Sequence, residues 1–268
     1  MKKLGRFWLI LILFLGICAG VLRGIEVSAH FDWDTALYEP FSTAFVLPLY
    51  AALSLALIAA VSAAYRGKVT DFNRTYALGK PGLFFAAAAS LGLCAAGLWK
   101  LFEAMTALKA VQILLGIMTT LGGAALLTLA MARHAGTMPG PARFFSSIAI
   151  FWGCFLLVVT YMEHPVEPVI RNFVYDILAS CAIVFALFWF IAPLFREAGR
   201  GRSLFFSLSG VYLVLLTGVG RIVAFLLSGE IRNLTDAPYR MLLFGCAGVL
   251  LLQNAAALLR AEKETGDR

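Results

Sequence analysis

Long apolar stretches alternate with short polar ones along the whole chain. About 20 consecutive apolar residues form a helix long enough to cross the hydrocarbon of a bilayer. Strand pairs are excluded because lipid offers no hydrogen bonds to the open edges of a sheet. The pattern predicts eight transmembrane helices, over residues of about 7–22, 43–65, 82–99, 110–132, 144–162, 173–195, 203–228 and 239–259.

Composition strengthens the prediction of a membrane protein. Of the 268 residues, 61% are hydrophobic and 14% are charged, whereas soluble domains carry roughly 25% charged residues. Because the connecting segments are short, we expect residues 1–268 to form a single integral membrane domain, an all-α polytopic transmembrane helix bundle.

The charge pattern predicts the orientation of the bundle. The net charge is +7, but the basic residues stand in short runs between apolar segments, which favours membrane topology over nucleic-acid binding. Lysine and arginine are dense at both ends of the chain and in every second connecting segment, such as 66–81 and 196–202. By the positive-inside rule both termini are cytoplasmic, and this face would meet anionic lipid. The segments on the opposite side include Arg23, Glu26, Lys100 and Glu103.

Two ionisable residues fall inside the predicted helices, at roughly matching depths from the outer side. These are Asp176 in the sixth helix and Arg221 in the seventh. A charge at the bilayer centre costs about 2.5–3.5 kcal/mol on insertion scales, so such residues usually face a partner or a watery cavity. We expect both to point into the bundle as a candidate intramembrane polar pair, with either a structural or a functional role.

A second group of polar residues lies in the predicted outer loops. It consists of His30, Asp32, Asp34, Glu163, His164 and Glu167. Histidine with carboxylates can bind a divalent metal. The spacing matches no ligand signature, however, and an acidic solvated loop explains the same residues. The sequence therefore predicts no metal site and no cofactor, and keeps this outer-face cluster as a weak alternative.

Small residues indicate close packing between helices. Gly16 and Gly20 form a GxxxG pattern in the first helix, which lets backbones approach each other in lipid. The pattern favours packing within the bundle, with dimerisation through this helix as the alternative.

Signatures of enzymes are absent from the sequence: it contains no HExxH, GxSxG, Walker or GxGxxG motif. Glu167 and Arg171 partly match a double-glutamate motif of one family of intramembrane peptidases, but Val166 replaces the first glutamate. The histidines that such chemistry would need inside the membrane fall in loops instead. These absences argue against a redox carrier or a metalloprotease and favour a non-enzymatic role, but they do not argue against every enzyme.

Two stretches carry a resemblance to known proteins. They are Leu22-Arg23-Gly24-Ile25-Glu26, followed by Asp34-Thr35, and Tyr161-Met162-Glu163-His164, continuing to Tyr175. They resemble a group of uncharacterised multi-pass membrane proteins of bacteria. The resemblance implies the eight-helix fold and a bacterial cytoplasmic membrane, and it brings no activity with it.

Three functional hypotheses follow from these observations. The leading one is a non-enzymatic accessory, sensor or assembly component in the membrane, whose partners are the bilayer and a second membrane protein or another copy of the chain. The alternative is a small-solute transporter with a polar site near Asp176 and Arg221. The third is an intramembrane enzyme, which would need acids and histidines that converge in one pocket.

Overall fold

The structure is a computed structural model that describes residues 2–32, 37–38, 46–65, 67–162, 170–228 and 237–261. Side chains are described for 4–28, 46–65, 67–162, 174–227 and 238–260. The long helices are α1 Lys2–His30, α2 Val46–Ala64, α4 Lys80–Thr106, α5 Ala110–Ala135, α7 Ile148–Met162, α8 Ile170–Ile191, α9 Arg200–Ser228 and α10 Ala237–Ala261. The short elements are α3 Phe72–Thr75, α6 Gly140–Ser146, η1 Ala192–Leu194 and the strands β1 Phe31–Asp32, β2 Leu37–Tyr38, β3 Lys68–Val69 and β4 Ala198–Gly199.

The prediction of an all-α helix bundle is confirmed. Within the described ranges, eight helical segments are long and apolar enough to cross a membrane, with α6 and α7 forming one of them. The strands, which the sequence did not predict, are two-residue antiparallel pairs: β1 with β2 and β3 with β4.

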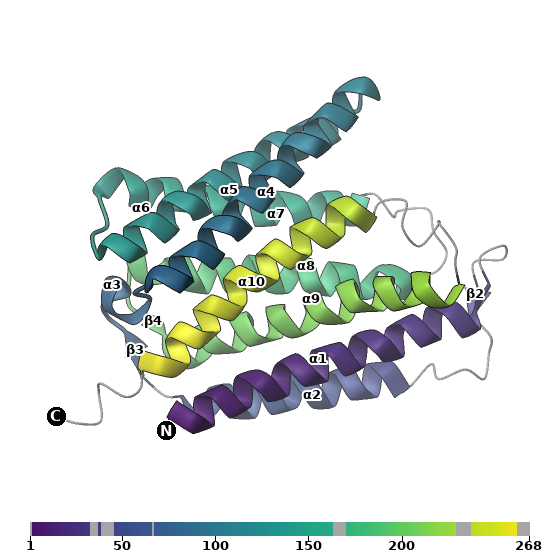
Figure 1. Ribbon diagram of the computed structural model, residues 1–268, viewed down its shortest axis with the longest axis horizontal. Helices are drawn as coiled ribbons and strands as arrows, with labels where there is room; N and C mark the ends of the chain where they lie inside the picture. The colour runs from purple at the N-terminus through teal and green to yellow at the C-terminus, as the bar shows by residue number, and fades with distance from the viewer. Residues whose placement is uncertain are drawn as a thin grey trace.

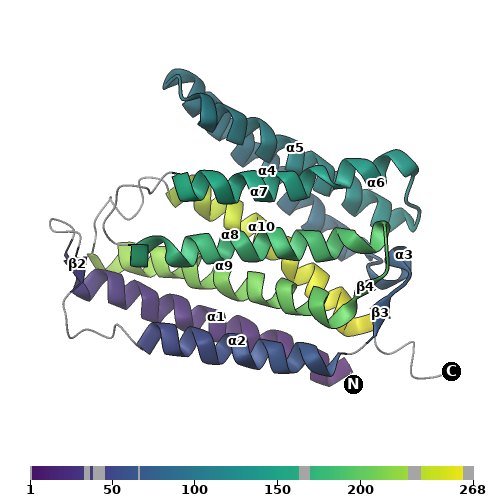
Figure 2. The same ribbon diagram turned by 180° about the vertical axis from the view of Figure 1, so that it is seen from behind.

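The helices run alternately up and down. The beginning of α1 and the end of α10 lie at the same end of the bundle (Figure 1), which we call the proximal end; the opposite end is the distal end. α9 lies between α1 on one side and α8 and α10 on the other, with α2 against the α1–α9 pair. α4 packs on α10 and α5, α5 on α7, and α7 on α8. Figures 1 and 2 both show the distal part of the α4–α5 hairpin projecting away from the other helices.

Proline and glycine mark several helix ends. Pro81 stands in the first turn of α4, where its missing N–H costs no helical hydrogen bond. α5 ends at Gly136, whose φ of 70° is the left-handed conformation that glycine adopts without a steric penalty. Pro81 and Gly136 therefore mark where α4 begins and where α5 ends, both at the proximal end of the bundle.

Several helices are longer than the predicted spans. The sequence pattern placed Arg23, Glu26, Lys100 and Glu103 in connecting segments, and this prediction was wrong. α1 extends to His30 and α4 to Thr106, so all four residues lie within helices. In both helices the basic residue stands three positions before the acid and forms a salt bridge with it. This pairing offsets part of the cost of desolvation and allows the helix to continue past its apolar run.

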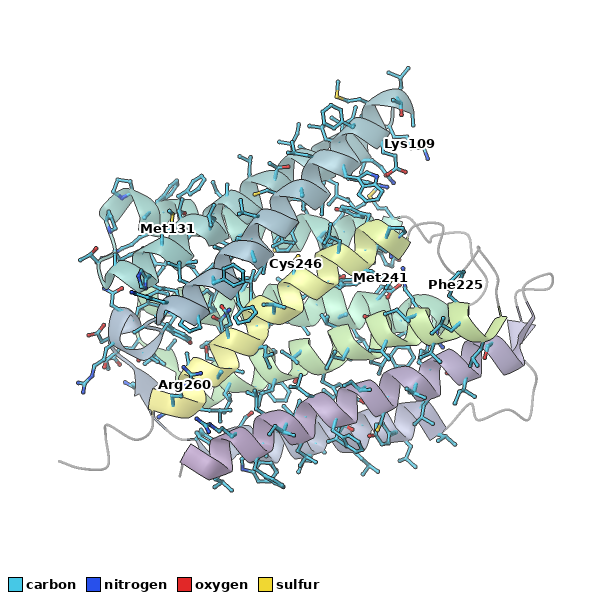
Figure 3. All side chains as sticks on the ribbon, in the orientation of Figure 1. Lys109, Met131, Phe225, Met241, Cys246 and Arg260 are labelled. Carbon is cyan, nitrogen blue, oxygen red and sulfur yellow. The ribbon has the colours of Figure 1, made fainter. Side chains whose placement is uncertain are left out.

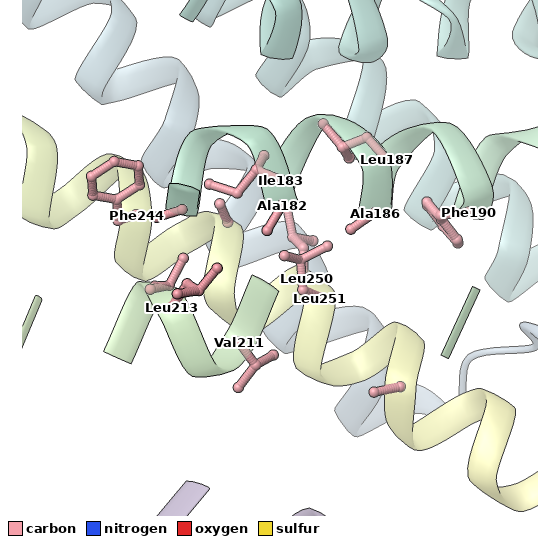
Figure 4. Close-up of a cluster of buried hydrophobic side chains, with 14 of the residues drawn as sticks. Ala182, Ile183, Ala186, Leu187, Phe190, Val211, Leu213, Phe244, Leu250 and Leu251 are labelled. Atoms are coloured by element: carbon pink, nitrogen blue, oxygen red, sulfur yellow. The ribbon is translucent and has the colours of Figure 1, made fainter. Parts of the chain in front are cut away.

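A cluster of buried apolar side chains lies where α8, α9 and α10 meet (Figure 4). Ile183 and Phe190 of α8, Val211 of α9 and Leu251 of α10 are 3% exposed or less. Large apolar side chains such as Phe84 and Phe151 are exposed instead. Figure 3 shows side chains projecting from the outside of the bundle along its length. An outer surface of this kind is stable in contact with acyl chains and not with water.

The glycines of α1 are used for contact with α9. A Cβ added at Gly20 would lie 2.6 Å from Val219 Cβ, and one at Gly24 would lie 2.4 Å from Val223 Cβ. Gly16 faces Leu215 in the same row. The GxxxG face is therefore covered by α9 within one chain, as the packing interpretation expected, and it is not open to a second copy.

Candidate functional site

The candidate pair from the sequence, Asp176 and Arg221, forms an ion pair between α8 and α9. Arg240 of α10 also faces this carboxylate, with its Nη1 at 3.6 Å from Asp176 Oδ2. The Asp176 and Arg240 side chains are 5% and 7% exposed, and that of Arg221 is 24% exposed. One buried carboxylate thus joins three helices through two guanidinium groups.

A second ion pair lies on α1 beside the first. Arg23 Nη1 is 3.2 Å from Glu26 Oε2, and both side chains are buried. The Arg23 guanidinium stands 5.2 Å from the centre of the Tyr175 ring. Its aliphatic stem packs where a side chain at position 220 would be, so Gly220 leaves the room that Arg23 occupies. Because Tyr175 and Gly220 directly precede Asp176 and Arg221, the two ion pairs are neighbours.

A third group of contacts extends towards the α4–α5 hairpin. Lys100 Nζ lies 5.4 Å from the centre of the Tyr239 ring and 3.2 Å from Glu103 Oε2. The Tyr239 and Thr119 hydroxyls are 3.3 Å apart, and Trp152 Nε1 donates to Thr119 Oγ1 at 3.1 Å. Tyr239 directly precedes Arg240, so this third group of contacts lies next to the ion pair of Arg240 with Asp176.

We call these charged residues, all in the distal half of the bundle, the distal charge network. Its described members are Arg23, Glu26, Lys100, Glu103, Asp176, Arg221 and Arg240. The sequence indicated only two of them, because the others stand near the ends of apolar runs, where charge usually marks an interface. The signal that could have found Arg23 and Lys100 is the acid three residues after each, at the spacing of helical neighbours.

A separate polar cluster closes the proximal end. Arg133 of α5 is 3% exposed and donates through Nε to the Tyr76 carbonyl at 2.9 Å. The Tyr76 hydroxyl is 3.0 Å from Ser203 Oγ, which itself donates to the Trp189 carbonyl at 2.9 Å. Because Ser203 gives its one hydroxyl hydrogen to Trp189, the Tyr76 hydroxyl is the donor to Ser203 Oγ. Burial raises the pKa of Tyr76 to about 12. The cluster fixes the connection between α3 and α4 against α5 and α9.

The outer-face cluster largely lies outside the described residues. This holds for Asp34, Glu163, His164 and Glu167, and for the side chains of His30 and Asp32, whose backbones end α1 and form β1. Its possible role in metal binding stays a prediction. Among the described residues, no group of three histidine, cysteine or acidic side chains is placed to hold a metal ion.

Comparison with known proteins gives no match to this chain among family models, curated proteins or solved structures. The class of the protein therefore follows from its own structure. Eight long apolar helices with large apolar side chains on their outer faces define a multi-pass helical membrane protein.

Proposed function

We propose that this chain is a non-enzymatic accessory, sensor or assembly component of a bacterial cytoplasmic membrane, in which the distal charge network fastens the helices together. The observation that carries this proposal is the pairing of Asp176 with Arg221 and Arg240 across α8, α9 and α10. A charge pair buried between helices restricts which helices can be neighbours and at what register, a use well attested for buried polar groups.

The way in which the other charges are used supports the same interpretation. Arg23 is held by Glu26 on its own helix and by the Tyr175 ring on α8, and Lys100 is held between Glu103 and the Tyr239 ring on α10. Cations placed over aromatic faces in a desolvated site contribute about 2 kcal/mol or more. These contacts tie α1 to α8 and α4 to α10, which is the role of a scaffold.

Thiol labelling tests this proposal against transport. In a variant in which all five native cysteines are replaced by alanine, cysteine is introduced at Ala179, which is 0% exposed and stands one turn from Asp176. We expect no labelling by a membrane-impermeant thiol reagent from either face of sealed vesicles, because the helices pack closely around position 179 and leave no aqueous path to it. Leu108→Cys at the α4–α5 turn, 87% exposed, is the matched control and should label rapidly from one face.

Labelling of Ala179→Cys from both faces would contradict a fastening and favour the second candidate, a small-solute transporter. One observation favours that candidate. The described members of the network comprise four cationic and three acidic side chains, so a solute admitted there would be an anion. An intramembrane enzyme is less supported, because two of the three histidines belong to the outer-face cluster and the third, His134, is exposed in the last turn of α5 at the proximal end.

The orientation is part of the proposal. The basic proximal end, which carries Lys68, Arg74 and Arg143, would face the cytoplasm, with both termini on that side. The support is the excess of lysine and arginine in the proximal connections, which is the signature of the cytoplasmic face. The partner would be a membrane protein or a second copy that contacts the lipid-facing surface.

A further inference from the structure

A groove of about 520 Å³ opens at the proximal end between α2 and α9, far from the distal charge network. Ala59 and Ala63 of α2 form one wall, and Phe205 and Phe206 of α9 form the other. The two alanines are exposed and the two phenylalanines are half-buried. The walls are therefore apolar and open to the side of the bundle, where acyl chains surround a membrane protein.

Glycines build the closed end of the groove. Gly67 has a φ of 124° and allows the tight turn after α2. A Cβ at Gly201 would lie 2.7 Å from the Ser62 carbonyl oxygen, so only glycine lets the start of α9 approach α2 this closely. The β3–β4 pair and the hydrogen bond from Arg200 N to Gly67 O tie the two helix ends together (Figure 2).

The closed end has the electrostatic character of an anion site. It lies at the N-terminus of α9, a 29-residue helix with no acidic residue in its first turn. The N–H groups of Gly201 and Arg202 have no partner within the helix, and the helix dipole adds partial positive charge there. Arg202 lines the groove with an exposed side chain, its guanidinium 5.4 Å from the centre of the Trp189 ring.

A buried polar group without a partner points to a ligand independently of the helix end. Ser62 lines the groove and is 3% exposed, and its hydroxyl has no hydrogen-bond partner among the described residues. Buried hydroxyls are normally hydrogen-bonded, so this one lacks an acceptor or donor that a bound group could supply.

Groups that would compete with an anion are already engaged. The Ser62 carbonyl accepts from Tyr65 N at 3.1 Å, and the Gly67 carbonyl accepts from Arg200 N at 3.0 Å. Glu197, the acid that comes shortly before α9, pairs with Lys68 at 2.7 Å.

We propose that this groove binds an anionic phospholipid. Its headgroup phosphate would lie at the N-terminus of α9 beside Arg202 and Ser62, and one acyl chain would lie along Ala59, Ala63 and Phe206. A choline headgroup places a cation next to its phosphate, which Arg202 and the helix dipole disfavour, so the site selects for lipids of net negative charge. The inference is independent of the proposed accessory role and holds for a transporter as well.

Native mass spectrometry of the full-length protein released from nanodiscs tests the proposal. The nanodiscs contain equal amounts of phosphatidylglycerol and phosphatidylcholine, and a second sample in detergent receives inorganic phosphate alone. We expect one retained phosphatidylglycerol per chain. Arg202→Ala should reduce its occupancy by a factor of about five, since a basic residue at the membrane surface contributes about 1 kcal/mol. Ala63→Trp should reduce it by filling the groove without a change of charge.

Arg143→Ala is the matched control, because it removes an exposed arginine at the same end from α6 and should leave the bound lipid unchanged. Equal retention of both lipids, or equal losses in Arg202→Ala and Arg143→Ala, would overturn the proposal. If the protein retained inorganic phosphate and showed no preference between the lipids, the bound anion would be free phosphate and not a lipid headgroup, and the proposal of a lipid would be wrong. A circular dichroism spectrum of each variant equal to that of the parent protein shows that the helices are intact.

Discussion

Asp176→Ala is expected to destabilise the protein by about 3–5 kcal/mol, because it removes the buried carboxylate that the Arg221 and Arg240 guanidinium groups share. The Arg240 side chain is 7% exposed and that of Arg221 is 24% exposed, so the shared carboxylate is removed from a largely buried site. The measurement is the free energy of unfolding in mixed detergent micelles, followed by circular dichroism.

A double-mutant cycle separates the ion pair from the loss of packing. Asp176→Asn and Arg221→Gln should each destabilise the protein, and the double variant should recover about 1–3 kcal/mol of the summed loss. Lys68→Gln with Glu197→Gln is the matched control, because this is also a cation–carboxylate pair but its side chains are 70% and 57% exposed. We expect no measurable change for the control. Equal effects at the two pairs would contradict the role of the distal network as a fastening.

Gly20→Ala is expected to separate α1 from α9 and to lower the free energy of unfolding by about 1–3 kcal/mol. The new Cβ would meet Val219 Cβ at 2.6 Å and the Leu215 carbonyl oxygen at 2.9 Å, and the backbone oxygen can move only if the whole helix moves. Since the same row of contacts continues at Gly24, we expect the Gly20→Ala, Gly24→Ala double variant to lose the α1–α9 interface altogether.

Gly245→Ala provides the control for this prediction. It makes the same chemical change inside α10 at a position where a Cβ meets nothing within 4 Å. Alanine there should leave stability equal or raise it by up to about 1 kcal/mol through its higher helix propensity. Indistinguishable unfolding curves for Gly20→Ala and Gly245→Ala would contradict the tight α1–α9 contact.

The sequence predicted the membrane-spanning helices well because the length of an apolar run depends on local composition alone. It also indicated Asp176 and Arg221, because a charge inside an apolar run is conspicuous. It did not indicate that Arg23 and Lys100 are buried, since their burial depends on Tyr175 and Tyr239, which are distant in sequence.

The sequence could not predict the proximal groove either, because the groove also depends on contacts between residues that are distant in sequence. Gly67 and Gly201 form it only when α2 and α9 meet, and nothing in either segment alone indicates that meeting. Two-residue strands such as β3 and β4 are too short to produce an alternating pattern, so the link that holds the groove together has no sequence signal.

Reporter fusions at three points of the chain test the central claim, that this polypeptide crosses the membrane eight times with both ends in the cytoplasm. Alkaline phosphatase, which is active only outside the cytoplasm, is fused after Leu108, after Gly136 and after Ala261. The account predicts high activity for the fusion after Leu108 and background activity for the other two, with a fluorescent reporter giving the reverse pattern. High phosphatase activity after Gly136 or after Ala261 would contradict it.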